Sequence, residues 1–241
     1  TTDRFSQYAI AYTKPEKASD DSNGSSGKIS VKIANAINPD EHISYIKGYS
    51  DNTFKPENII TRAEVTTILS RLSENYNDNQ YYANSFSDVY DGNWYSNVIG
   101  FASQYGLIKG YEDGSFIPEG EMDRAEFAAV IVRFKNLDIA TNTDAPFNDI
   151  SGHWAENYIL TLYKQGWISG YGDGTFKPDE PVTRAEAVKI INAAIGRTPN
   201  KAKVEANISN FAIPFIDVDN SHWGYCEILE ATIIHKITDF N

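Results

Sequence analysis

Three arginines occupy equivalent positions in this chain and are its best candidates for binding an anion. They are Arg62, Arg124 and Arg184. Each follows a residue that favours a helix N-cap, so each should lie in a first helical turn, where free backbone N–H groups attract an anion. A guanidinium there can bind a carboxylate or a phosphate through paired hydrogen bonds. A salt bridge to one of the chain's many carboxylates explains the arginines equally well, and the sequence leaves both interpretations open.

Three tryptophans recur at a second set of equivalent positions, Trp94, Trp154 and Trp223. So large a ring most often packs in a core, and we expect these to be core residues with one edge facing a groove. An exposed tryptophan could instead stack on a sugar ring. We expect ligand grooves between neighbouring repeats, each formed by an arginine-helix start and the tryptophan helix that follows. The expected pairs are Arg62 with Trp94, Arg124 with Trp154 and Arg184 with Trp223.

Other chemically active residues give weaker patterns, and we expect no catalytic residue, metal site or cofactor. His153 and His222 precede two of the tryptophans, but Asn93 stands at the third position. That exchange favours hydrogen bonding over metal binding or proton transfer. Cys226 is the single cysteine, which excludes an internal disulfide. No serine–histidine–aspartate set, glycine-rich phosphate loop or catalytic carboxylate pair recurs in a convincing context.

An aspartate recurs in three loops that begin with Gly-Tyr. The three are Asp51, Asp113 and Asp173. Each loop resembles a fragment of a calcium-binding loop, but it carries only one or two carboxylates, which are too few to hold the ion. The Asp-Gly pairs at 113–114 and 173–174 instead predict tight turns with positive φ.

The composition excludes several classes of partner. The 241 residues include 21 lysines and arginines against 33 aspartates and glutamates, a formal charge of −12. So acidic a chain is not expected to bind nucleic acid or an anionic membrane surface. No apolar run reaches the ~20 residues that a membrane span needs, so membrane insertion is not expected. Hydrophobic residues make up 41% of the chain, which is enough for a folded core.

The candidate residues lie in an internal repeat of about 60 residues. A Gly-Tyr loop is followed by an arginine helix in three copies, and the arginines are 62 and 60 residues apart. Between these units a Phe-x-Asp element precedes each tryptophan. The first copy lacks the tryptophan and contains Pro39, and the last Phe-x-Asp half-repeat ends before any loop arrives. We place the boundaries at 1–27 (tail of a preceding module and linker), 28–78, 79–140 and 141–198 (repeats), and 199–241 (connection and terminal half-repeat).

The local signals predict an all-α fold. Thr61, Asp123 and Thr183 stand three residues before a glutamate, the pattern of a capping box, and apolar residues then follow at helical spacing. The repeats therefore predict three helical hairpins in a pseudo-threefold arrangement. We expect a closed ring in which the terminal half-repeat, residues 215–240, packs beside the first copy. The N-terminal segment Phe5–Tyr12 reads as a short β-like strand, followed by a linker over 19–28, and both should be separable from the repeats.

The repeated elements resemble S-layer homology (SLH) domains. The resemblance covers about residues 28–240 and rests on Phe-x-Asp-Val followed by Trp, on Gly-Tyr-x-Asp-Gly-Thr-Phe-Lys-Pro and on Thr-Arg-Ala-Glu. It implies a secreted module, usually of three repeats, that holds a larger surface protein on a bacterial cell wall or S-layer. The partner would be secondary cell-wall polysaccharide or another peptidoglycan-linked glycan, often pyruvylated. The family's arginine falls on Arg62, Arg124 and Arg184 and is associated with the acidic ketal of the ligand.

Departures from the family pattern weaken individual grooves. Asp123 stands where the family commonly has threonine, which would place a carboxylate beside the anion site of Arg124. We therefore expect Arg62→Ala and Arg184→Ala to weaken glycan binding with the fold intact, and Arg124→Ala to matter less.

Two functions of different kind remain open. The first is a non-catalytic carbohydrate anchor. The alternative is a structural or protein–protein assembly module of an S-layer, in which the arginines form salt bridges and no glycan binds. A hydrolase with an acid pair scattered through the repeats is the weakest interpretation.

Overall fold

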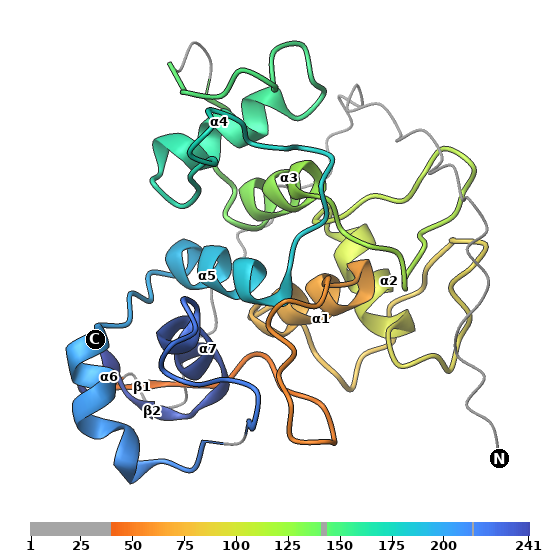
Figure 1. Cartoon of the computed structure of the whole chain (residues 1–241). Coiled ribbons are helices and arrows are strands. Elements are labelled where there is room, and N and C mark those ends of the chain that lie inside the picture. Colours follow the sequence, from red (N-terminus) through yellow and green to blue (C-terminus); the bar gives the residue numbers. More distant parts are fainter. Residues whose placement is uncertain (1–39, 141–143, 214) are drawn as a thin grey trace, which may run out of the picture.

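The computed structural model describes residues 40–140, 144–213 and 215–241 (Figure 1). The predicted strand Phe5–Tyr12, the linker over 19–28 and Pro39 lie outside these residues. The described chain is helical, as expected, with one two-stranded antiparallel sheet. The elements in order are β1 (Glu41–His42), α1 (Arg62–Arg71), α2 (Ser96–Gln104), α3 (Arg124–Phe134), α4 (Glu156–Lys164), α5 (Arg184–Ala194), α6 (Lys201–Asn207), the 3-10 turn η1 (Ile208–Asn210), α7 (Tyr225–Thr232), β2 (His235–Lys236) and α8 (Ile237–Phe240).

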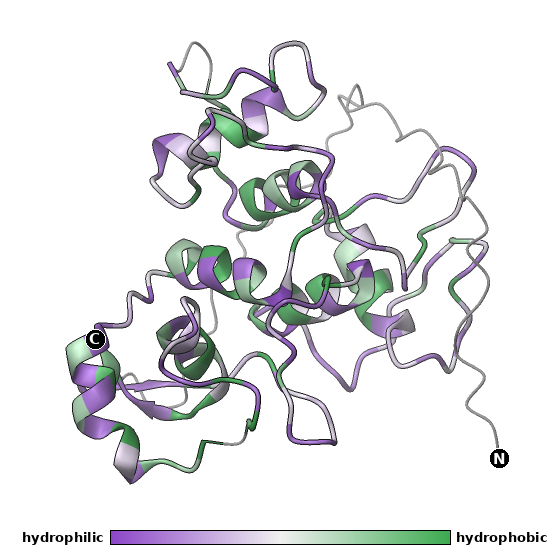
Figure 2. Cartoon of the chain, in the orientation of Figure 1, coloured by the Kyte–Doolittle hydropathy of each residue, from purple (hydrophilic) through white to green (hydrophobic). Residues whose placement is uncertain are grey.

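The helices pack in three pairs, each made of one arginine helix and one tryptophan-side helix. The pairs are α1 with α2, α3 with α4, and α5 with α7. Figure 1 shows α1, α3 and α5 at the centre, with α2, α4 and α7 outside them. In Figure 2 hydrophobic residues concentrate in α2, α3 and α7, which supply much of the shared core. None of the helices in the described ranges has the length and apolar character needed to traverse a bilayer.

The arginine helices begin where their capping signals predict. In α1 the Thr61 hydroxyl accepts from Glu64 N at 3.2 Å, and the Glu64 carboxylate accepts from Thr61 N at 2.9 Å. The same reciprocal pair of bonds starts α3 at Asp123 and α5 at Thr183. All three capping boxes are therefore confirmed, and they fix the direction in which each arginine leaves its helix.

A triangle of backbone hydrogen bonds closes the three repeats into a ring. It joins the residues just before the caps: Ile60 N donates to Val182 O, Val182 N to Met122 O, and Met122 N to Ile60 O, at 2.9–3.2 Å. The three side chains are buried where the repeats meet. A cyclic order in which each repeat bonds to the next confirms the predicted pseudo-threefold arrangement.

The terminal half-repeat completes the first copy. In the second repeat the Asp88 carboxylate accepts from two successive loop N–H groups, of Phe116 and Ile117, at 2.8 and 2.7 Å. Asp217 makes the same two contacts with the loop of the first repeat, with Phe54 N and Lys55 N, both at 2.8 Å. The expected packing of residues 215–240 beside the first copy is thus confirmed.

The loops between the helices form the tight turns that the sequence predicts. Gly114 and Gly174 have φ of 80° and 82°, and Asn52 takes this conformation in the first copy with φ of 61°. The phenylalanine of each loop is fully or almost fully buried and anchors the loop to the helices. These are Phe54, Phe116 and Phe176.

Candidate functional site

Each repeated arginine reaches across the ring to the capping glutamate of another repeat. The Nη1-to-Oε1 distances are 3.0 Å for Arg62–Glu126, 3.1 Å for Arg124–Glu186 and 2.8 Å for Arg184–Glu64. The second oxygen of each glutamate accepts from the N–H of its own cap residue. One carboxylate therefore caps a helix and also ties two repeats together. The structure shows the salt bridges that the sequence left as one of two interpretations.

The remaining guanidinium nitrogens are also engaged, except in one repeat. Arg62 donates from Nε to Phe116 O at 2.8 Å and from Nη2 to Lys109 O at 2.9 Å. Arg184 makes the equivalent pair of bonds to Phe54 O and Lys47 O. Arg124 keeps only the Nε bond, and no hydrogen bond from its Nη2 is formed within the described ranges. Arg124 is thus the arginine whose Nη2 can donate a hydrogen bond to a ligand.

The helix starts do not supply N–H donors to a ligand, which corrects our expectation. In α1, Arg62 N donates to Gly120 O at 2.9 Å and Ala63 N to Pro118 O at 2.8 Å, while the third N–H is held by the Thr61 cap. The starts of α3 and α5 bond to loop carbonyls in the same way. A neighbouring loop thus occupies the place that a single isolated helix would leave to an anion.

The tryptophans are exposed, so our expectation that they lie in the core is wrong. Trp94, Trp154 and Trp223 expose 59%, 45% and 53% of their surface. Each lies just before its helix, where the ring points outward, while residues further along, such as Ile99, fill the core. An indole face that remains open to solvent can stack on a sugar ring.

The two histidines before tryptophans act as hydrogen-bonding residues, as the sequence predicts. His153 Nδ1 accepts from Ala155 N at 3.1 Å, and His222 Nδ1 accepts from Gly224 N at 3.0 Å. Their other nitrogens face the exposed carboxylates of Asp179 and Glu57. These bonds fix the turn that leads into each tryptophan-side helix.

A cleft of about 290 Å³ lies at the junction of the second and third repeats and the terminal half-repeat. Arg124 and Glu186 line it together with Lys189, Tyr171 and Trp223. The tryptophan that shares a cleft with Arg124 is therefore Trp223 and not Trp154, which corrects the predicted pairing. This pair is shifted by one repeat because Arg124 leaves its own repeat to reach Glu186 of the next.

Positive charge gathers around this cleft, which we call the Arg124 cleft. Lys189 Nζ lies 5.7 Å from the centre of the Trp223 ring. An adjoining hollow of about 430 Å³ shares Tyr171 and Trp223 with it and adds Lys177. Lys177 Nζ lies 4.4 Å from the centre of the Tyr171 ring. Three cations and two aromatic faces thus lie on one surface, together with the carboxylates of Glu57, Glu180 and Glu186.

The corresponding surface of the second repeat is lined by acidic side chains, with no cation among the described residues that line it. A cleft of about 390 Å³ there is lined by Tyr111 and Ile117 and by the acidic residues Glu121, Asp123 and Asp179. Tyr111 belongs to the loop against which Arg62 packs, with the Arg62 guanidinium carbon 4.8 Å from the ring centre. The Asp123 carboxylate therefore adds negative charge on the side of the ring where Arg62 lies. We had expected it to act beside Arg124. We call this hollow the Asp123 cleft.

The loop aspartates serve turns, as predicted. The Asp51 carboxylate accepts from Thr53 N at 3.1 Å and from the Thr53 hydroxyl at 2.5 Å. Asp113 and Asp173 make the same two bonds within their loops. The hydroxyl bond is the main cause that lowers the pKa of each of these carboxyls below its usual value.

Sequence reasoning did not single out Lys189, Lys177 or Tyr171. The tyrosine recurs in every Gly-Tyr loop and could have been found from the repeat. Lys189 could not, because Ala129 and Thr67 occupy its position in the other two repeats. A position that differs among the copies carries no repeat signal, even where it determines the charge of a cleft.

Comparison with known proteins agrees with this geometry. The model of the S-layer homology domain matches residues 44–66, 85–128 and 146–188. Each matched segment contains one of the three arginines with its capping residue.

Several characterised relatives share these repeats. The chain is 38% identical over 209 residues to Cell surface glycoprotein 1 of Acetivibrio thermocellus, covering 81% of this chain and 9% of the relative. It is 37% identical over 203 residues to the Cellulosome-anchoring protein of the same organism, covering 81% and 43%. An S-layer protein of Bacillus licheniformis is 31% identical over 169 residues, with 69% and 19% covered. The chain thus spans less than half the length of these relatives. The three matched segments and these relatives show that this chain belongs to the S-layer homology family.

Proposed function

We propose that this chain is a non-catalytic module that anchors a larger surface protein non-covalently to a bacterial cell wall. The family supports this proposal, and relatives include a cellulosome-anchoring protein and an S-layer protein. The module accordingly works at the cell surface, in the cell wall or S-layer. Its partners are a wall glycan on one side and the rest of a surface protein on the other.

The ligand that fits best is an acidic saccharide of the wall, such as a pyruvylated secondary cell-wall polysaccharide. The observation that carries this choice is the Arg124 cleft, where the exposed Trp223 ring lies beside Lys189 and Arg124. A sugar ring can stack on Trp223 while a carboxylate on that sugar binds Lys189 and the unbonded Nη2 of Arg124. A carboxylate gains more there than elsewhere on the surface because charge-assisted hydrogen bonds are the stronger kind.

The three junctions between repeats are not equivalent in this proposal. The Arg124 cleft binds the acidic sugar, and the Asp123 cleft repels it because Asp123, Glu121 and Asp179 line it. Arg62 and Arg184 serve mainly to close the ring, since each makes three hydrogen bonds inside the protein. Trp154 and Trp94 then contribute less than Trp223 does.

An assembly module without glycan binding is the second candidate. It is favoured by the arginines, whose engagement in internal salt bridges needs no ligand. In that case the exposed tryptophans would contact another protein of the surface layer.

Binding to purified wall polysaccharide, before and after removal of its acidic substituents, separates the two candidates. We expect Lys189→Ala to weaken binding about ten- to a hundredfold, the loss of one charge-assisted contact. Trp223→Ala should weaken it too, whereas the matched variant Trp154→Ala, which removes a tryptophan that does not line the Arg124 cleft, should have little effect. Binding that ignores the acidic substituents, or that survives Lys189→Ala and Trp223→Ala together, would reject the acidic-sugar site. Absence of binding by the wild-type chain would favour the assembly module.

A further inference from the structure

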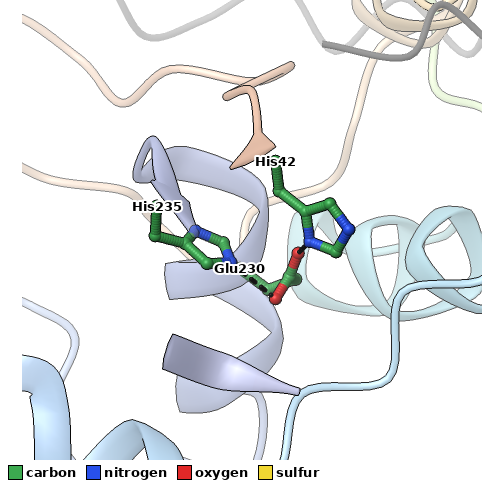
Figure 3. Close-up of side chains that lie close together, drawn as sticks. All are labelled: His42, Glu230 and His235. Atoms are coloured by element: carbon green, nitrogen blue, oxygen red, sulfur yellow. Dashed lines mark hydrogen bonds and ion pairs between the residues drawn. The ribbon is translucent and has the colours of Figure 1, made fainter. Parts of the chain in front are cut away.

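A cluster of two histidines and a glutamate lies away from the clefts, where the two ends of the described chain meet. His42 belongs to β1, Glu230 to α7 and His235 to β2. Figure 3 shows both imidazole rings directed at the Glu230 carboxylate. His42 Nδ1 lies 2.5 Å from Glu230 Oε1, and His235 Nε2 lies 3.1 Å from Glu230 Oε2. The three ligand atoms all lie within 4.8 Å of one another.

The fold itself brings these residues together. Strands β1 and β2 pair antiparallel with His42 directly opposite His235, so both side chains leave the same face of the ribbon. Their rings meet edge to face, with centres 5.4 Å apart. Glu230 comes from the last turns of α7, five residues before His235 and 188 residues after His42. Sequence reasoning missed the cluster because only the closed ring joins its members.

The cluster is buried on the protein side and open on one side. The side chains of Glu230 and His235 have no exposed surface, whereas that of His42 is 15% exposed. A small ion can therefore enter past His42 and meet two further ligands in an environment that excludes bulk water.

The hydrogen bonds of His235 require a positive charge inside the cluster. His235 Nδ1 lies 2.8 Å from the carbonyl oxygen of Ile233, which can only accept, so Nδ1 carries the hydrogen. In a neutral ring Nε2 then presents a lone pair to Glu230 Oε2, which also presents one. Two acceptors 3.1 Å apart in a buried site need a proton or a metal ion between them. The same Nδ1-to-carbonyl bond orients histidines that ligate metals through Nε2.

We propose that His42, Glu230 and His235 form a binding site for a divalent transition-metal ion of the zinc class. Two nitrogens and one carboxylate with a fourth position open to water is a common ligand set for Zn²⁺. Ligand atoms on a tetrahedral zinc stand about 3.3 Å apart, given metal–ligand bonds of about 2.0–2.2 Å. The His235–Glu230 pair at 3.1 Å already has this spacing. The His42–Glu230 pair at 2.5 Å, made to the other carboxylate oxygen, has to open by less than about 1 Å, and ligand atoms up to 4.8 Å apart have to approach each other. The metal displaces the hydrogens that now separate these atoms and releases them to solvent.

Neighbouring groups support and limit the site. Asn241 Nδ2 donates to Glu230 Oε2 at 3.1 Å and holds that carboxylate in place. Arg197 Nη1 lies 3.9 Å from Glu230 Oε1 and donates to Ile43 O at 2.9 Å. Its charge opposes a second cation, so we expect a site of moderate affinity that tightens in Arg197→Met. The bound metal would clip β1 to β2 and so lock the closure of the ring.

The test is titration of the untagged chain, stripped with a chelator, with zinc by calorimetry and with cobalt by visible absorption. We expect one ion per chain, cobalt bands of a tetrahedral site, and a higher melting temperature with zinc. His42→Ala and His235→Ala should each weaken zinc binding at least about tenfold. His153→Ala is the matched control, because it removes a histidine–carboxylate pair outside the cluster.

Each alternative outcome is decisive. If His235→Ala loses its far-ultraviolet dichroism, the more exposed His42→Ala variant decides alone. Absence of binding by the wild-type chain overturns the proposal and leaves a proton as the charge between His235 and Glu230. Binding that survives in the folded histidine variants, or that falls equally in His153→Ala, also overturns it.

Discussion

The Asp123 cleft and the hollow that adjoins the Arg124 cleft occupy equivalent places in the second and third repeats but differ in charge. Two pairs of equivalent positions make the difference: Lys177 and Ile117, and Thr183 and Asp123. By contrast, the arginine, the capping glutamate and the loop phenylalanine are the same at every junction. Residues that close the ring repeat because the ring needs each of them, whereas residues that line a cleft are free to differ. A repeated buried residue therefore reports architecture here, whereas the charged residues that vary between copies decide which cleft can attract an anion.

The largest expected effect follows from removing an arginine that closes the ring. Arg62→Ala should lower the free energy of unfolding by about 3–5 kcal/mol, because it leaves the buried Glu126 carboxylate without its cation. This replaces our expectation that the fold survives the change. Urea denaturation measures it, with Lys47→Ala as the control, since that change keeps the Lys47 carbonyl that accepts from Arg184. A loss below about 1 kcal/mol would mean that the arginine ring contributes little.

Arg124→Ala sharpens the comparison between the two sides of the ring. Arg124 makes one hydrogen bond fewer, and its partner Glu186 is 26% exposed compared with 5% for Glu126. We expect a smaller loss, about 1–3 kcal/mol, together with weaker glycan binding. An equal loss of stability in Arg62→Ala and Arg124→Ala would contradict the distinction that we draw.

The contact of the terminal half-repeat with the first Gly-Tyr loop should stabilise the fold as much as the equivalent contact in the third repeat does. Asp217→Ala removes two charge-assisted bonds, from Phe54 N and Lys55 N, and should cost about 2–3 kcal/mol. Asp149→Ala is the matched variant, since Asp149 makes the same bonds with Phe176 N and Lys177 N. Thermal or urea unfolding of the two proteins should give the same loss within about 1 kcal/mol. A neutral Asp217→Ala would show that the ring is open in solution.

The smallest expected effect is a gain. The double variant Ile117→Lys/Asp123→Thr gives the Asp123 cleft the two residues that distinguish the hollow beside Trp223. Threonine also caps helices, so the stability should change by less than about 1 kcal/mol. Binding to the acidic wall polymer should strengthen several-fold, about 1 kcal/mol. Equal binding by wild type and variant in a direct titration would mean that charge at this junction does not select the ligand.

The sequence predicted the architecture well because its signals are local and repeated. Thr61 and Glu64 are enough to predict a helix start. The two incomplete ends of the repeat pattern predict that the terminal half-repeat completes the first repeat. The same logic failed for Glu64 in one respect: we assigned its carboxylate to capping alone. Its Oε2 does cap, but its Oε1 accepts from Arg184, 120 residues away.

The failures at the site have one physical cause. Whether Trp223 is buried, and which arginine it meets, depends on how the repeats dock, and no local pattern encodes that. The amphipathic period predicts that Ile99 faces the core. A tryptophan ring that precedes its helix can face either the core or the solvent. The His42–Glu230–His235 cluster is the extreme case, because its members approach only after the whole ring has formed.

The closure of the first copy by residues 215–240 also sets the order of events during synthesis. Until those residues leave the ribosome, the loop around Phe54 has no Asp217 to satisfy its N–H groups, and α5 has no α7 to cover it. The nascent chain must hold an open, partly apolar surface through most of its translation, since contacts so distant along the chain form late. Nearly the whole chain therefore has to be made before the module can fold cooperatively. A truncated product would expose an apolar surface prone to aggregation and would not form a smaller working anchor.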